Sequence, residues 1–121
     1  MGKASREHGK YYEREAVHFW RTLGYEDARR TQQYAGGVDS ADITGGPASF
    51  HIEVKGGKSL PNVYEAIGQA RRDAGPMKIP LVQIKRAHKE WVFVIPYEHI
   101  DFVTRCVEHY VKDRDASGST G

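Results

Sequence analysis

The amino-acid sequence predicts an α/β fold, in which a central mixed β-sheet is flanked by helices. Two amphipathic helical patterns, a polar–apolar alternation over residues 50–55 and two later apolar runs carry this prediction. The expected order of elements is α-β-β-β-α-β-β-α, and layer rules place the helices against the faces of the sheet. At 121 residues, the chain is expected to form one domain over residues 1–112, followed by a disordered polar tail over residues 113–121.

The first helix is expected over residues 5–23 and ends at Gly24. Apolar side chains recur there with the spacing of one buried helical face, at Tyr12, Ala16, Phe19, Trp20 and Leu23. Glu13 falls at the edge of this stripe, where its carboxylate can either reach inward to a site or extend into water. Residues 26–34 are polar with weak strand character, and they predict a half-exposed first strand followed by a flexible loop at 35–37.

A β-hairpin is expected around residues 45–47, whose Gly-Gly-Pro sequence is typical of a turn. Asp42 lies at the start of the strand before this turn. It is preferred over Asp39 as a site residue because it directly precedes the apolar Ile43, whereas Asp39 lies in the loop. The strand after the turn alternates, with His51, Glu53 and Lys55 on one face and Phe50, Ile52 and Val54 on the face that suits a core.

The second half of the chain predicts one more helix, two strands and a last helix. The helix over residues 62–74 has a buried face, expected at Val63, Ala66, Ile67 and Ala70. Strands are expected over residues 80–85 and 91–95. The final amphipathic segment, over residues 97–111, is expected to pack on the body of the domain through Ile100, Phe102, Val103 and Val107.

Composition is that of a soluble globular protein, with 39% hydrophobic and 28% charged residues. No apolar run approaches the roughly 20 residues of a membrane span, and the N-terminal residues lack the apolar segment of a signal peptide. Cys106 is the single cysteine, which predicts a buried thiol in a reducing, intracellular setting. The net charge of +2 permits a nucleic-acid partner without indicating one.

The hairpin predicts a metal-dependent phosphodiester hydrolase. Residues that face each other across a strand pair are about 4.5–5.5 Å apart at Cβ, so one divalent ion could bridge Asp42 and Glu53. Magnesium prefers such oxygen ligands, and manganese can substitute for it; the carbonyl oxygen of Val54 is a further candidate ligand. Lys55 would orient the attacking water or stabilise charge on the phosphate. His51 shares this face and is expected to have a structural or supporting role.

Several sequence motifs resemble those of a known family. An acid at a hairpin start is followed by Glu-x-Lys at residues 53–55, and residues 9–15 read Gly-Lys-Tyr-Tyr-Glu-Arg-Glu. This combination resembles the PD-(D/E)XK nuclease superfamily, and within it the archaeal-type Holliday junction resolvases, some of which are encoded by viruses. The likeness covers residues 8–95. Ala41 replaces the proline of the superfamily name, and the second helix lacks the phenylalanines that help the resolvases to dimerise.

The resemblance implies a restriction-endonuclease-like core and a homodimer that nicks opposed strands of a four-way DNA junction. It implies that Glu13, Asp42 and Glu53 hold one or two magnesium ions while Lys55 assists the water. Candidate DNA contacts are Arg14, Arg29, Arg30, Lys58, Gln69, Arg72 and Lys85. Two alternatives remain open: another DNA nuclease of the same fold, of nickase, repair or restriction type, and a catalytically silent DNA-binding module.

Overall fold

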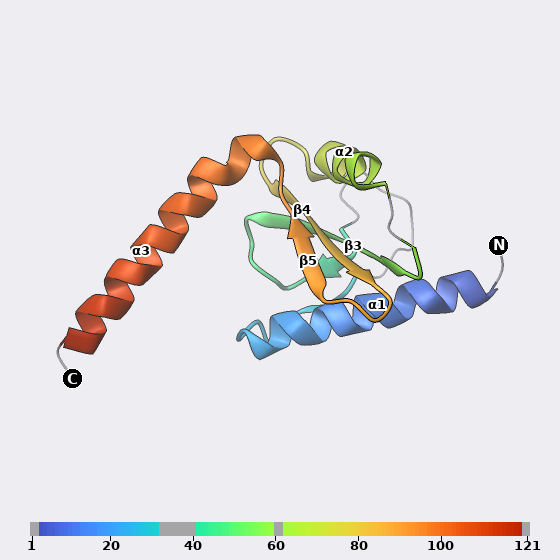
Figure 1. The fold of residues 1–121 in the computed structure, drawn as a ribbon, viewed down its shortest axis with the longest axis horizontal. Helices are drawn as coiled ribbons and strands as arrows, with labels where there is room; N and C mark the ends of the chain where they lie inside the picture. The colour runs from blue at the N-terminus through green and yellow to red at the C-terminus, as the bar shows by residue number, and fades with distance from the viewer. Residues whose placement is uncertain (1–2, 32–40, 60–61, 120–121) are drawn as a thin grey trace.

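The computed structural model describes residues 3–31, 41–59 and 62–119, and this part of the chain has the predicted α/β class (Figure 1). The elements are α1 (Lys3–Thr22), β1 (Arg29–Arg30), β2 (Ile43–Thr44), β3 (Phe50–Gly57), α2 (Val63–Ala74), β4 (Ile79–Arg86), β5 (Trp91–Val94), the short 3-10 helix η1 (Tyr97–His99) and α3 (Ile100–Ser119). The predicted order is therefore confirmed, with η1 added before α3. Asp39 and residues 32–37 of the expected strand and loop lie outside the described residues.

The sheet has five strands in the order β1-β2-β3-β4-β5 within the described residues. Only β3 and β4 are parallel, because α2 connects them as a crossover; the other neighbouring pairs are antiparallel. The turn between β2 and β3 contains Gly45 at a positive φ of 81°. A side chain at Gly45 would collide with the backbone carbonyl of Asp27, so this turn depends on glycine.

The helices α1 and α2 cover opposite faces of the sheet (Figure 1). Tyr12, Ala16 and Trp20 of α1 pack with the apolar face of β3, as predicted. Ala66 and Ala70 of α2 pack against β4 on the other face, also as predicted. The prediction for Leu23 is wrong: it is exposed because α1 ends at Thr22, before this residue. Phe19 is half-buried at the border of the core.

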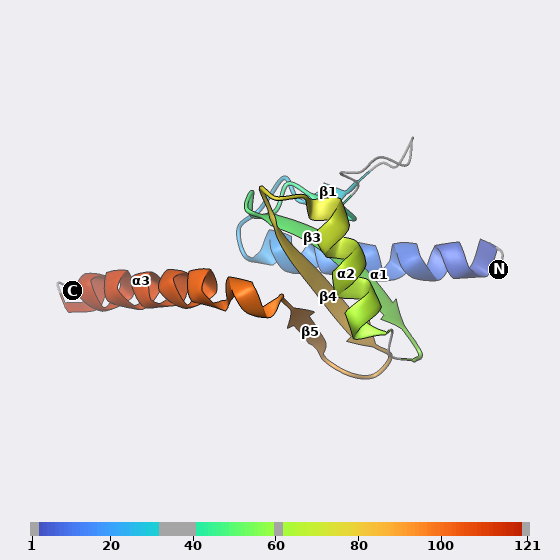
Figure 2. The same cartoon turned by 90° about the horizontal axis from the view of Figure 1, so that it is seen from above.

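Helix α3 departs from three predictions. It extends away from the sheet (Figures 1 and 2) and continues to Ser119, so residues 113–119 are helical where a disordered tail was expected. The expected packing on the body is largely absent, since Ile100, Phe102 and Val107 are 56%, 46% and 54% exposed. Val103 alone of that predicted set is half-buried. Cys106 is also exposed, which corrects the expectation of a buried thiol.

Among the described residues, no helix combines the length and the apolar character that crossing a bilayer requires.

Candidate active site

The pairing of β2 with β3 brings Asp42 beside Glu53, as the hairpin prediction required. Ile43 pairs with Ile52, and the backbone N–H of Asp42 donates to the carbonyl oxygen of Ile52 at 2.9 Å. Asp42 precedes Ile43 and Glu53 follows Ile52, so the two acids are neighbours across the antiparallel pair. One Asp42 carboxylate oxygen, Oδ2, also accepts a hydrogen bond from the backbone N–H of Val54 at 2.8 Å. The side chain of Asp42 thereby holds β3 at the point next to the start of β2.

Asp42 is half-buried and Glu53 is buried, and the two carboxyl groups are unfavourable neighbours when both are charged. Burial, followed by the charge of Glu53, raises the pKa of Asp42 to about 8, while the Val54 N–H acts in the opposite direction. A side-chain hydrogen bond with Glu53 and the charge of Glu13 raise the pKa of Asp42 further. Two carboxyl groups that hold a proton between them at neutral pH can exchange it for a divalent cation. The oxygen donors present here therefore fit Mg²⁺ or Mn²⁺.

A third carboxylate reaches this region from α1. The ring of Tyr12 packs so closely on Gly56 that a side chain at Gly56 would collide with it, which fixes α1 directly over the end of β3. Glu13 is the next residue of α1. It is half-buried and accepts a hydrogen bond at Oε1 from Nε of Arg30 at 2.9 Å. The charge of Glu13 also contributes to the raised pKa of Asp42, so this carboxylate lies in the vicinity of the site.

Lys55 and Val54 complete the predicted catalytic strand. Lys55 is half-buried and lies two residues after Glu53, so both side chains point to the same face of β3. Val54 enters the site through its backbone N–H, which binds Asp42. The structure thus places Asp42 and Glu53 together at the start of β2 and the middle of β3, with Lys55 on the same face of β3 as Glu53. Glu13 lies on α1 beside Arg30, and within the described residues it does not join the other two acids in a three-residue ligand group.

Glu53 has a second set of neighbours that the sequence prediction did not include. Nε2 of His51 lies 2.8 Å from Oε1 of Glu53, and both side chains are buried. A carboxylate oxygen of Asp73, on α2, completes a group whose ligand atoms all lie within 4.8 Å of one another and which could hold a metal ion. The signal for Asp73 was its place seven residues after Ala66, which puts it on the sheet-facing side of α2.

A basic hollow lies beside Glu13. It has a volume of about 250 Å³, and its lining residues are Arg14, Val17, Arg21, Arg29 and Arg30. Arg14, Arg29 and Arg30 were predicted as DNA contacts, and Arg30 is the one that pairs with Glu13. Arg21 was missed, although it lies seven residues after Arg14 and therefore on the same side of α1. Three of the four arginines already donate hydrogen bonds within the protein, to the carbonyl oxygens of Ala28 and Asp27 and to Glu13. The positive charge that the four share still suits the binding of phosphate.

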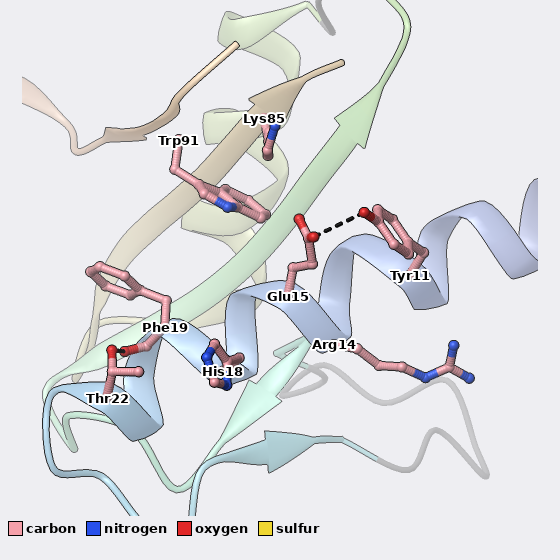
Figure 3. A pocket seen from close by; sticks show the side chains of 8 residues that line it. All are labelled: Tyr11, Arg14, Glu15, His18, Phe19, Thr22, Lys85 and Trp91. Atoms are coloured by element: carbon pink, nitrogen blue, oxygen red, sulfur yellow. Dashed lines mark hydrogen bonds between the residues drawn. The ribbon is translucent and has the colours of Figure 1, made fainter. Parts of the chain in front are cut away.

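The other predicted DNA contacts lie elsewhere. Lys58 follows β3 and is exposed, as are Gln69 and Arg72 on α2. Lys85 lines a larger hollow of about 690 Å³ between α1 and the β4–β5 hairpin, among aromatic residues that include Phe19 and Trp91 (Figure 3). Its Nζ donates to the carbonyl oxygen of Lys89 at 2.7 Å. Arg14 also lines this larger hollow, so it borders both hollows, although its guanidinium points away from Lys85 in Figure 3.

Comparison with known proteins adds no assignment. No protein-family model, no curated protein and no solved structure matches this chain.

Proposed function

We propose that this protein is a metal-dependent DNA endonuclease whose catalytic centre is formed by Glu13, Asp42, Glu53 and Lys55. One observation carries the proposal: the carboxyl groups of Asp42, half-buried, and Glu53, buried, are hydrogen-bonded neighbours across the β2–β3 pair, and the charge of Glu13 on α1 adds to the raised pKa of Asp42. An arrangement of this kind is unfavourable for the apo-protein and becomes favourable when a divalent cation neutralises it. Acids alone would repel the phosphates of DNA.

In this proposal each residue has one task. Asp42, Glu53 and Glu13 hold Mg²⁺, with Mn²⁺ as a substitute; the bound ion would offset negative charge on the phosphate and lower the pKa of water. Lys55 carries its ammonium group on the same strand face, where it can hydrogen-bond to the attacking water or to a phosphate oxygen. Arg30 orients Glu13 through the 2.9 Å contact, and the neighbouring arginines bind flanking phosphates.

The substrate we propose is the four-way DNA junction, cut by paired symmetric nicks. This part rests on the motif resemblance over residues 8–95, together with the basic hollow that borders Glu13. Paired nicks require two centres related by a two-fold axis, so the proposal includes a homodimer. Other nucleases of the same fold, and a silent DNA-binding module, are the competing functions that the experiment separates.

The experiment compares cleavage of a labelled four-way junction with cleavage of linear duplex of the same base sequence. Each substrate is incubated with Mg²⁺, with chelator, and with the Glu53→Gln variant. The matched control is Glu65→Gln, which changes an exposed acid on α2. We expect paired symmetric nicks in the junction alone, retained by Glu65→Gln and lost with chelator or Glu53→Gln.

Other outcomes reject parts of the proposal. Equal cutting of duplex and junction would retain the nuclease and reject the junction as its specific substrate. Tight junction binding without cutting, in Mg²⁺ and in Mn²⁺, would reject the enzyme and favour the binding module. Cleavage that survives Glu53→Gln would show that the catalytic centre lies elsewhere.

A further inference from the structure

Glu53 lies between two groups of polar side chains. On one side it meets Asp42, as described above. On the other it contacts His51, whose Nε2 is 2.8 Å from Glu53 Oε1, with side chains that are only 3% and 6% exposed. Asp73 joins this second group from α2, and the three ligand atoms lie within 4.8 Å of one another.

We propose that His51, Glu53 and Asp73 form a second cation site, which takes a transition-metal ion such as Mn²⁺ or Zn²⁺ and shares Glu53 with the Asp42 side. The site is distinct in chemistry from the carboxylate group around Asp42, because it offers an imidazole nitrogen. The proposal goes beyond the nuclease function and can succeed or fail independently of it.

The spacing of the ligand atoms is close to what such an ion requires. Nitrogen and oxygen ligands lie about 2.0–2.2 Å from Zn²⁺ in a tetrahedral site, so adjacent ligand atoms are about 3.3–3.6 Å apart around one ion. The contact between His51 Nε2 and Glu53 Oε1 is shorter, at 2.8 Å, so binding of the ion would replace the hydrogen-bonded proton and move these two atoms slightly apart. A carboxylate oxygen of Asp73 lies within 4.8 Å of both of these ligand atoms, and α2, which carries it, is held on the sheet by the buried Ala70 and Ala74.

The charges agree with a divalent ion. A neutral imidazole and two carboxylates carry a net charge of −2, and a divalent cation cancels it in a setting where uncompensated charge is costly. Nitrogen ligands suit Mn²⁺ or Zn²⁺ better than Mg²⁺, which keeps oxygen ligands and water. The two sides of Glu53 are therefore expected to differ in metal preference, with the oxygen-only side suited to Mg²⁺.

Pulsed EPR of Mn²⁺ bound to untagged protein tests the site directly, because a coordinated imidazole couples its nitrogen nuclear spin to the manganese. We expect this coupling in the unmodified protein and in Asp42→Asn, and its loss in His51→Gln. Mn²⁺ affinity, measured by titration calorimetry, should fall about 10-fold or more in His51→Gln and Asp73→Asn. The matched control is His18→Gln, which alters an exposed histidine of α1.

Absence of nitrogen coupling in the unmodified protein would overturn the proposal, and so would coupling that persists in His51→Gln. Unchanged Mn²⁺ affinity in Asp73→Asn would reject the three-ligand site. Urea unfolding of each variant shows whether it is folded at the concentrations used. Junction cleavage in Mg²⁺ is scored separately, so loss of the second site and loss of the nuclease function give different patterns.

Discussion

The two faces of strand β3 are buried to nearly the same extent and carry opposite chemistry. On the face toward α1, Ile52 is 1% exposed and Val54 is 8% exposed; on the face toward α2, His51 is 2% exposed and Glu53 is 5% exposed. The first face packs into the apolar cluster formed with Tyr12, Trp20 and Leu81. The second face meets Asp42 on one side and Asp73 on the other.

The apolar face of β3 stabilises the fold, whereas the polar face carries the candidate site. Burial of an aliphatic side chain such as Ile52 contributes about 1.5–3 kcal/mol to folding. Burial of Asp42 next to the charge of Glu53 works against folding, and these two causes raise the pKa of Asp42 to about 8. Perturbed carboxyl groups of this kind concentrate at functional sites, so the polar face of β3 is where function is expected.

The largest expected effect is a gain of stability in Asp42→Asn. The pKa of Asp42 rises from 3.8 to about 8 in the folded protein, so between these values the folded state binds a proton that the unfolded state lacks. Stability is therefore full below pH 4 and falls by up to about 1.4 kcal/mol per pH unit as the pH rises to 8. Asn carries no charge, and we expect Asp42→Asn to be about 2–4 kcal/mol more stable at pH 8.5.

Urea unfolding in chelator at pH 5 and pH 8.5 measures this effect. The unmodified protein should lose stability between the two values while the variant changes little, and added Mg²⁺ should stabilise only the unmodified protein. If the free energy of unfolding varied with pH in the same way in both proteins, the carboxyl group of Asp42 would not be the source of the pH dependence.

The second effect is a loss of stability, and it concerns the apolar face of β3. Ile52→Ala removes a side chain from the apolar cluster, and we expect a loss of about 3 kcal/mol in the free energy of unfolding, in the range typical for such cavities. Urea unfolding at pH 7 provides the measurement, with Val92→Ala, at a 45% exposed position, as the control. A loss below about 1 kcal/mol would show that the apolar face is not the main source of stability.

Much of the fold could be predicted because its patterns coincide with burial. The 3.6-residue period identified α1 and α2, and the alternation over residues 50–55 was enough to separate the two faces of β3. The glycine-rich turn before Pro47 placed Asp42 opposite Glu53, because a short hairpin leaves few possible registers.

The failures share a physical cause. An apolar stripe on a helix shows that the helix has a preferred face, but it does not show what covers that face. For this reason the prediction that α3 packs on the body through Ile100 and Val107 was wrong. The prediction of a buried Cys106 failed for the same reason, because this residue also lies on α3. Asp73 was missed for the complementary reason: its proximity to His51 and Glu53 depends on how α2 docks on the sheet, which is a tertiary property.

The third effect tests a polar contact within the apolar face. Nε1 of Trp20 donates to Oε1 of Gln83 at 2.9 Å in the core, and among the described residues Nε2 of Gln83 is buried without a partner. Trp20→Phe should cost about 2 kcal/mol, since it leaves Gln83 wholly unsatisfied and removes packing. Adding Gln83→Leu should recover about 1 kcal/mol of this loss, because both polar partners are then gone.

A double-mutant cycle by urea unfolding measures that coupling. Additive losses in Trp20→Phe and Gln83→Leu would show that the hydrogen bond has no role, and the two faces of β3 would then differ even more sharply in their tolerance of polar groups.

The smallest effect concerns the outer side of α1, where arginines border Glu13. Arg14 is exposed and lines the basic hollow, so Arg14→Gln should leave stability within about 0.5 kcal/mol of the unmodified protein. If Arg14 neutralises one DNA phosphate, the slope of the logarithm of junction affinity against the logarithm of salt concentration should become less steep by about 1. Arg105→Gln serves as the control, because Arg105 lies on α3 and pairs with Asp101. Equal slopes for both variants would mean that DNA does not bind at the hollow, whereas a change confined to Arg14→Gln would connect the phosphate contacts with the carboxylates on the polar side of β3.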